Sequence, residues 1–289
     1  MTWSEAILYA EQQLDEGAIH EARLTAELLA AHVLKVWNRS EVRTLLIRVI
    51  TDEELASFKT LVDRRLAGEP LQYIIGEAEF FGLRIFTTPA ALIPRPETEL
   101  LVEEVLRELR LRGYVAPRIL DIGTGSGAIA LAIAANLHDA QILGVDASVD
   151  AVRLAEQNRV LLKLANVQFE VCDIFSDSNA LGIFDVVLSN PPYIPVSEIA
   201  DLDRELRDRE PRMALTDESD GLSFYRRIAE IVDEIMHPAG ILALEMGFGA
   251  SNAVREIMQS HNINCLRVVD DLGGIPRVFI GERTPQVKV

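Results

Sequence analysis

The chain has 289 residues, with 45 acidic and 28 basic side chains and a formal net charge of −17. A hydrophobic content of 49% supplies a full core, and the length predicts one large domain together with a smaller one. No basic half is present to neutralise phosphates, which argues against a nucleic-acid substrate without excluding a local basic patch.

The chain has two cysteines, Cys172 and Cys265, which are far apart and have no metal-like spacing. We expect buried thiols in a reducing cytoplasm, and no metal site. The N-terminal residues lack the basic and apolar regions of a secretion signal, and no uncharged run reaches the length that spans a membrane. These features predict a soluble, cytoplasmic protein.

Residues 1–78 are predicted to form a small helical bundle. Thr2 and Glu5 have the spacing of a capping box before an amphipathic run, and the same spacing recurs before the run at 52–66. A second helix is expected at about 21–36. The charged faces of these helices carry no recognisable chemistry, so two roles stay open for the bundle: a plain helical cap, or a module that docks the substrate.

Residues 79–92 are predicted to link the bundle to a second domain at 93–289. The stretch from Phe80 to Thr87 is rich in residues that favour strands, and Gly82 lies in its middle. A glycine at this place lets the chain turn back on itself without steric strain. The linker is therefore expected to be a β-hairpin.

The second domain opens with the run Ile93-Pro94-Arg95-Pro96-Glu97-Thr98. Pro96 is well placed as the first residue of an amphipathic helix that ends near Arg110, with acidic residues in its first turn. Arg95 is restricted between two prolines, and both a role beside a cofactor and simple helix capping are open for it. We include Arg95 and Glu97 among the candidate cofactor-binding residues.

From residue 118 onward, apolar strand-like runs alternate with helical patterns. This alternation predicts an α/β domain with a mostly parallel, doubly wound sheet of seven strands, which is a Rossmann-like fold. Helices are expected at about 148–164, 222–236 and 251–260. The strand-like runs lie at 119–122, 142–145, 167–171, 186–188, 241–244, 266–269 and 277–280.

A glycine-rich turn follows the first strand of this sheet and opens a helix. It supplies five candidate cofactor-binding residues: Gly123, Thr124, Gly125, Ser126 and Gly127. Glycines let the backbone turn sharply and approach a ligand without a Cβ in the way. We therefore expect the backbone of this loop to lie directly against a cofactor.

Acidic residues end the next two strands and extend the candidate cofactor site. Asp146 lies 19 residues beyond Gly127. A carboxylate there can accept hydrogen bonds from both hydroxyls of a ribose, and such a bond is worth about 1.5–3 kcal/mol. Asp173 follows the third strand, where it can receive an adenine amino group, with Ile174 as an apolar neighbour for the ring.

Two cofactors fit this arrangement, because the loop also matches G-x-G-x-x-A, the fingerprint of dinucleotide-binding proteins. NAD therefore remains an alternative to S-adenosylmethionine. The latter is favoured by Gly127, a third glycine at G-x-G-x-G spacing, and by Asp121, an acidic group near the amino-acid end of the cofactor. The tetrapeptide after the fourth strand also favours it, since hydride transfer has no evident use for that motif.

That tetrapeptide is Asn190-Pro191-Pro192-Tyr193, at the sheet edge where open α/β folds bind their ligands. The side-chain carbonyl of Asn190 and the backbone carbonyl of Pro191 are two acceptors, and the prolines fix φ and bring no competing N–H. Tyr193 adds a flat face for stacking. Two fixed acceptors beside a planar wall suit a substrate –NH2, such as a carboxamide or a base amine.

Taken together, these motifs resemble the HemK/PrmC family of release-factor glutamine methyltransferases. The Asn-Pro-Pro-Tyr motif alone is shared with DNA amino-methyltransferases and some RNA methyltransferases, whereas its combination with Ile-Pro-Arg-Pro-Glu-Thr is much narrower. One departure is visible: some members carry Trp where this chain has Ile174. The matching stretches are 93–98, 121–128, 145–146, 185–193, 210–212 and 214–215.

The resemblance implies a class I methyltransferase domain that uses S-adenosylmethionine and releases S-adenosylhomocysteine. The implied substrate is the glutamine in the Gly-Gly-Gln loop of peptide-chain release factors, methylated at N5, with the bundle docking part of the factor. Asn190 and Pro191 are implied to hold the amide, next to Pro192 and Tyr193, and Asn190 also lies beside the cofactor. No membrane or direct nucleic-acid partner is expected.

Three rival functions stay open. They are an amino-group methyltransferase acting on adenine or cytosine in DNA or RNA, a non-catalytic scaffold, and an NAD-linked dehydrogenase. The roles of Glu245 and of the charged run 201–212, either a mobile lid or a solvated helix, are also open.

Overall fold

The computed structural model describes residues 1–36, 39–176 and 181–283, so 37–38, 177–180 and the last residues of the predicted second domain, 284–289, lie outside the description. The chain divides into two compact units. The first comprises Met1–Glu77 and Asp203–Arg209, and the second comprises Ala78–Leu202 and Glu210–Val289.

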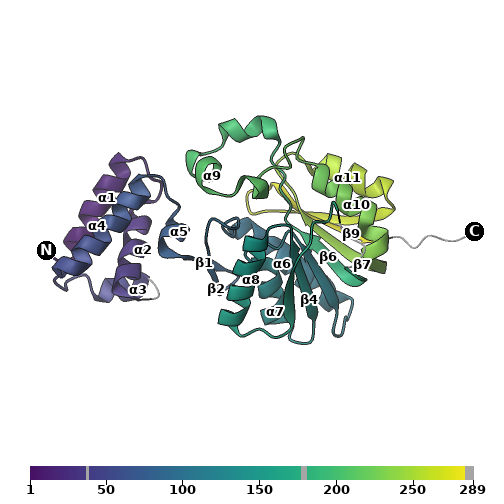
Figure 1. The fold of residues 1–289 in the computed structure, drawn as a ribbon, viewed down its shortest axis with the longest axis horizontal. Coiled ribbons are helices and arrows are strands. Elements are labelled where there is room, and N and C mark those ends of the chain that lie inside the picture. The colour runs from purple at the N-terminus through teal and green to yellow at the C-terminus, as the bar shows by residue number, and fades with distance from the viewer. Residues whose placement is uncertain (37–38, 177–180, 284–289) are drawn as a thin grey trace, which may run out of the picture. The chain divides into compact units, whose positions relative to one another are not determined.

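The first unit is helical, as its apolar periodicity predicts (Figure 1). The predicted capping box is present, because Glu5 N donates to Thr2 Oγ1 at 3.3 Å and Thr2 N donates to Glu5 Oε2 at 2.8 Å. In the core the ring of Trp3 meets that of Phe58 edge to face, with 5.4 Å between centroids. The helices are α1 (Trp3–Glu16), α2 (Ala22–Leu34), α3 (Arg39–Thr44), α4 (Asp52–Leu66), α5 (Leu71–Ile75) and α9 (Arg204–Arg209).

A two-stranded hairpin follows the helices, as the sequence predicts. Its strands are β1 (Glu77–Phe80) and β2 (Leu83–Phe86). The two turn residues, Phe81 and Gly82, have φ of 51° and 74°, the left-handed conformation that a two-residue hairpin turn requires. The hairpin is counted with the second unit from Ala78 onward.

The second unit is built on a seven-stranded sheet with the order β5-β4-β3-β6-β7-β9-β8 (Figure 1). The neighbours from β5 to β7 are parallel, whereas β9 runs antiparallel to both β7 and β8. All seven predicted strands are therefore confirmed. They are β3 (Arg118–Ile122), β4 (Gln141–Asp146), β5 (Val167–Val171), β6 (Phe184–Ser189), β7 (Met236–Glu245), β8 (Ile263–Asp270) and β9 (Pro276–Arg283).

Helices cover both faces of the sheet, as a doubly wound fold requires. Helices α6 (Glu99–Leu111) and α7 (Ala128–Asn136) pack on one face, and α10 (Ser223–Ile235) and α11 (Ser251–Ser260) pack on the other. Helix α8 (Val149–Leu162) lies beside α7 and against β5 (Figure 1). Three short 3₁₀ turns complete the unit: η1 (Pro96–Thr98), η2 (Val196–Asp201) and η3 (Arg212–Ala214).

Two expectations about side chains need correction or resolution. Cys172 and Cys265 are free thiols but only partly buried, because one follows β5 and the other lies in β8, the two edge strands of the sheet. The charged run 201–212 contains an exposed helix, α9, which favours the solvated-helix interpretation.

Among the described helices, none is long and apolar enough to cross a membrane.

Candidate active site

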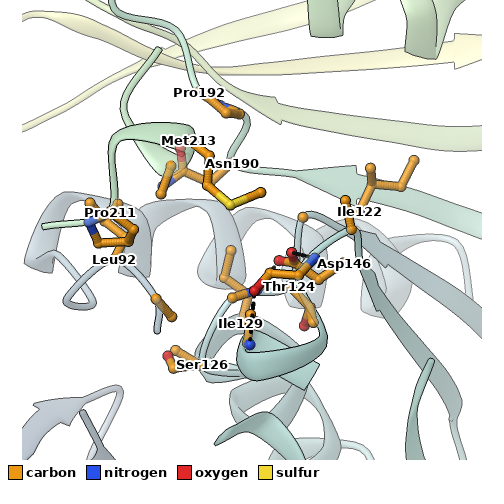
Figure 2. Close-up of a pocket in the computed structure, with 18 of the residues that line it drawn as sticks. Leu92, Ile122, Thr124, Ser126, Ile129, Asp146, Asn190, Pro192, Pro211 and Met213 are labelled. Atoms are coloured by element: carbon orange, nitrogen blue, oxygen red, sulfur yellow. Dashed lines mark hydrogen bonds between the residues drawn. The ribbon is translucent and has the colours of Figure 1, made fainter. Parts of the chain in front are cut away.

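The carboxyl ends of three adjacent strands form the floor of the site. Because β3 pairs with both β4 and β6, Ile122 lies level with Val145 on one side and with Ser189 on the other. The glycine loop, Asp146 and Asn190 therefore start from neighbouring points of the sheet edge. Figure 2 shows them around one pocket, with Asn190 across the pocket from Thr124.

The glycine loop turns through left-handed backbone conformations. Gly123, Gly125 and Gly127 have φ of 72°, 57° and 81°, which residues with a Cβ rarely adopt. Gly127 has a second constraint, since an added Cβ there would lie 2.8 Å from Phe169 and 3.0 Å from Ala155. The third glycine of the motif is thus required both by the turn and by close packing at the start of α7.

Asp146 anchors this loop from the end of β4. Its Oδ2 accepts a hydrogen bond from Gly125 N at 2.9 Å, and its Oδ1 accepts one from Ser148 N at 2.9 Å. Burial raises the pKa of Asp146, and these two backbone donors oppose the rise. Each carboxylate oxygen keeps lone-pair capacity for a further donor, so the predicted ribose contact is compatible with the anchoring role.

Asp121 lies beneath the loop and is fully buried. Thr124 Oγ1 donates to its Oδ2 at 2.7 Å. Burial raises the pKa of Asp121 to about 7, against the lowering effect of the Thr124 bond. Its Oδ1 has no hydrogen-bond partner in the part of the chain that the structure describes. Asp121 does not line the pocket, so it acts on the loop from below.

The predicted adenine end lies after β5. Ile174 is 3% exposed and lines the pocket together with Asp173, whose Oδ1 accepts a hydrogen bond from Phe175 N at 3.0 Å. Sequence reasoning missed Phe224, which also lines the pocket and meets Phe175 edge to face at 5.0 Å. It lies on α10, about 50 residues beyond Ile174, and its position has no local sequence signal.

Asn190 follows β6 with a defined amide orientation. Its Nδ2 donates to Thr98 Oγ1 at 3.1 Å, whereas its Oδ1 accepts no hydrogen bond from any described residue. Just before it, Ser189 Oγ donates to the Ile122 carbonyl at 2.7 Å and ties the ends of β6 and β3 together. The arrangement leaves the side-chain oxygen of Asn190 as a free acceptor at the pocket.

The rest of the tetrapeptide divides between pocket and core. Pro192 lines the pocket, but Pro191 is buried, and neither Pro191 nor Tyr193 is part of the lining. Tyr193 donates through its hydroxyl to Glu245 Oε1 at 3.4 Å, and an added Cβ at Gly247 would lie 2.8 Å from its ring. The expected open stacking face of Tyr193 therefore needs correction, since the ring is partly buried in the core beside Gly247.

Glu245, at the end of β7, is a buried acid beside the tetrapeptide. Burial raises its pKa to about 7, opposed by the hydroxyls of Thr98 and Tyr193 and by the charge of Arg277. The nearby charge of Glu97 raises it further. Its Oε2 is buried without a hydrogen-bond partner among the residues described.

The run that precedes α6 places its residues on different sides. Arg95 lines the pocket and forms an ion pair with Glu210, which the sequence analysis places in a matching stretch without assigning it a role. Glu97 is exposed and is not part of the lining, whereas Thr98 is buried and lines the pocket. The reason is the 3₁₀ turn η1, in which consecutive side chains point about a third of a turn apart.

A second missed residue supports the loop from α8. Asn158 is fully buried, accepts a hydrogen bond from Phe86 N at 2.7 Å, and donates to the Phe86 carbonyl at 3.1 Å. It also donates to the Ser126 carbonyl at 2.9 Å. One amide thereby joins the hairpin to the glycine loop, and nothing in the local sequence predicts this role.

The pocket fits S-adenosylmethionine. Ser126 Oγ is buried in the pocket wall without a hydrogen-bond partner within the described residues, which is the state expected of a group that meets a ligand. The lining contains Asp146, which suits the hydroxyl donors of a ribose, and Asp173, which suits an amino donor. Between these acids it offers the apolar side chains of Ile129 and Ile174. The fold and the site together define a class I S-adenosylmethionine-dependent methyltransferase.

Comparison with known proteins supports this class and narrows it. A family model described as a methyltransferase domain matches residues 115–267, and one described as the PrmC N-terminal domain matches residues 5–76. A methyltransferase from Pyrococcus furiosus shares the fold, with a TM-score of 0.50, 18% identity, and coverage of 71% of this chain and 91% of that one.

Curated relatives are closer in sequence. The release factor glutamine methyltransferase of Thermodesulfovibrio yellowstonii is 42% identical over 90% of this chain and 92% of its own length. That of Koribacter versatilis is 38% identical over 98% of this chain and 99% of its own length. The chain belongs to the family of release factor glutamine methyltransferases.

Proposed function

We propose that the protein transfers a methyl group from S-adenosylmethionine to the side-chain amide nitrogen, N5, of the glutamine in the Gly-Gly-Gln loop of peptide-chain release factors. The observation that carries the proposal is Asn190, whose Nδ2 is engaged by Thr98 while its Oδ1 is free at the pocket. An oriented acceptor beside a cofactor pocket suits a substrate that presents an –NH2 group.

The residues proposed to hold the cofactor surround the pocket. The loop from Gly123 to Gly127 offers its backbone, Asp146 is proposed to accept the ribose hydroxyls, and Asp173 with Ile174 to receive the adenine. Arg95 is the proposed partner of the carboxylate end. When bound, S-adenosylmethionine supplies an electrophilic methyl group on a sulfonium.

The chemical task of the protein is to activate a poor nucleophile. The lone pair of an amide nitrogen is delocalised into its carbonyl, the same resonance that gives the peptide bond its barrier of about 18–20 kcal/mol. We propose that Asn190 Oδ1 and the Pro191 carbonyl accept the two amide hydrogens and aim the nitrogen at the methyl group. Interactions that strengthen as the nitrogen loses planarity would lower the barrier without a strong base.

Docking of the release factor is proposed for the first unit. Its match to the PrmC N-terminal domain supports this role, and so do exposed apolar side chains on the unit, with Ile47 87% and Val49 66% exposed. Contiguous exposed apolar side chains are typical of binding surfaces. A substrate that works in translation also supports a cytoplasmic site of action.

Mass spectrometry tests the proposal directly. The protein is incubated with S-adenosylmethionine and a purified release factor, and in parallel with DNA and with RNA. We expect one added methyl group on the peptide that contains the loop glutamine, and none on the nucleic acids. Methylation of adenine or cytosine with an unmodified release factor would instead establish the nucleic-acid alternative.

A further inference from the structure

Two loops at the carboxyl edge of the sheet expose large apolar side chains. The first loop follows β7 and carries Phe248, which is 82% exposed. The second loop joins β8 to β9 and carries Leu272, which is fully exposed. Neither residue belongs to the lining of the cofactor pocket. Exposed apolar side chains that lie near each other are typical of surfaces that bind a partner.

Arg277 in β9 joins the two loops. Its backbone carbonyl accepts a hydrogen bond from Met246 N at 2.7 Å, and its Nε donates to Asp271 Oδ2 at 3.0 Å. Asp271 also fixes the second loop, because its Oδ1 accepts hydrogen bonds from Gly273 N at 2.8 Å and Ile275 N at 3.0 Å. The two exposed side chains are therefore held on ordered loops, so a partner that covers them loses little affinity to loop ordering.

The strand order places these loops on the far side of Asn190 from the cofactor pocket. Pocket residues follow β3, β4 and β5, Asn190 follows β6, and the two loops follow β7 and β8. Since β7 and β8 both run antiparallel to β9, their carboxyl ends lie at the same edge as that of β6. The first loop also lies against the tetrapeptide, because an added Cβ at Gly247 would be 2.8 Å from the ring of Tyr193.

We propose that Phe248 and Leu272 form an apolar rim that binds the backbone of the Gly-Gly-Gln segment of the release factor. The inference rests on the proposed function, in which the glutamine amide reaches Asn190. A glutamine side chain is short, so its neighbours in the segment must lie against the surface around Asn190. The two glycines carry no side chains, so their flat peptide groups can pack closely on an aromatic ring and a leucine.

Kinetics with an intact release factor tests the rim. We expect Phe248→Ala and Leu272→Ala each to raise the KM for the release factor about tenfold, the effect of losing one partly buried apolar contact. The affinity for S-adenosylmethionine and the free energy of unfolding should not change, because both side chains are exposed and outside the pocket.

The matched control is Leu111→Ala. Leu111 is 68% exposed at the end of α6, which leads to the amino end of β3 at the opposite edge of the sheet. We expect this variant to keep the wild-type KM for the release factor. Rim variants with the same KM as Leu111→Ala would overturn the inference.

A binding measurement without turnover keeps the inference distinct from the proposed function. S-adenosylhomocysteine has no methyl group to transfer, so calorimetry in its presence reports only how the release factor binds. Each rim variant should bind the release factor about tenfold more weakly than the wild type, and equal affinities would contradict the rim. Absence of methyl transfer to any release factor would contradict the proposed function, whatever the affinities show.

A second copy of this chain is the alternative partner for the rim. Sedimentation velocity of the free protein tests it by comparing the wild type with the double variant Phe248→Ala, Leu272→Ala. We expect the two proteins to sediment alike. A wild-type dimer that the double variant dissociates would assign the rim to self-association and overturn the inference.

Discussion

The backbone N–H of Ile93 donates a hydrogen bond to Glu210 Oε2, 3.0 Å away and 117 residues later in the chain. The other carboxylate oxygen of Glu210 pairs with Arg95, which lines the pocket. One buried acid thus fixes both the path of the run before α6 and the position of the one arginine in the predicted cofactor site. The run 93–98 and the segment 210–214 are far apart in the sequence, yet both contribute to the same wall of the pocket.

Replacing Glu210 should therefore weaken cofactor binding as well as stability. Glu210→Gln removes the negative charge that pairs with Arg95 at the pocket, and a lost charge-assisted hydrogen bond costs about 1.5–3 kcal/mol. We expect a lower free energy of unfolding in urea and a weaker affinity for S-adenosylmethionine by calorimetry. The matched control is Glu218→Gln, because Glu218 pairs with Arg212 on the exposed surface. Equal changes in unfolding free energy and in affinity for S-adenosylmethionine in the two variants would contradict this role for Glu210.

Gly127→Ala should destabilise the protein by more than its backbone conformation alone requires. A left-handed φ costs an alanine roughly 1–2 kcal/mol, and the added Cβ would also press on Phe169 and Ala155, which adds about 1–3 kcal/mol. Gly113→Ala isolates the first effect, since Gly113 has φ of 66° and no atom within 4 Å of an added Cβ. In urea denaturation, the free energy of unfolding of Gly127→Ala should be well below that of Gly113→Ala. Equal losses of unfolding free energy in the two variants would refute the packing argument.

Asn158→Ala should loosen the glycine loop from a distance. The change leaves three backbone groups without their partner, two at the exposed residue Phe86 and one at Ser126, and the loss at the buried Ser126 carbonyl alone costs about 1–3 kcal/mol. We expect a large loss of unfolding free energy and a weaker affinity for S-adenosylmethionine. Asn252→Ala serves as the control, because Asn252 is exposed on α11. A stable Asn158→Ala variant with normal affinity would show that the loop does not need this support.

Glu245 should also make stability depend on pH. Its folded-state pKa of about 7 lies above the ordinary value of 4.5, so between these values the folded protein holds a proton that the unfolded chain releases. The free energy of unfolding therefore falls as pH rises through this window, by about 3 kcal/mol in all. Relative to the wild type, Glu245→Gln should gain about that amount between pH 4.5 and pH 8. Parallel stability curves for the two proteins, measured in urea across this range, would contradict the buried ionisable state.

The strands and the glycine loop could be predicted because their signals are local. Seven apolar runs predicted seven strands, and the spacing of three glycines after the first of them predicted a ligand loop. Asn190 was predictable for the same reason, since a polar residue before two prolines at a strand end has few structural explanations.

The supporting residues could not be predicted, because their roles depend on tertiary contacts. Asn158 and Phe224 lie on helices whose sequence shows only an ordinary amphipathic pattern. Glu210 belongs to a matching stretch and to the charged run 201–212, and neither pattern assigns it a partner. Tyr193 was expected at the substrate, but Gly247 lets its ring pack into the core. Glu97 was a candidate cofactor residue, but the 3₁₀ turn η1 leaves it exposed and places Thr98 at the pocket, whereas the sequence predicts the start of an ordinary helix there.

The central claim is that Asn190 holds a release-factor glutamine for methyl transfer. The most direct measurement compares wild-type protein with Asn190→Ala, following methylation of the Gly-Gly-Gln peptide by mass spectrometry and cofactor affinity by calorimetry. We predict that transfer falls by at least about 100-fold while S-adenosylmethionine still binds. Normal turnover by Asn190→Ala would contradict the account.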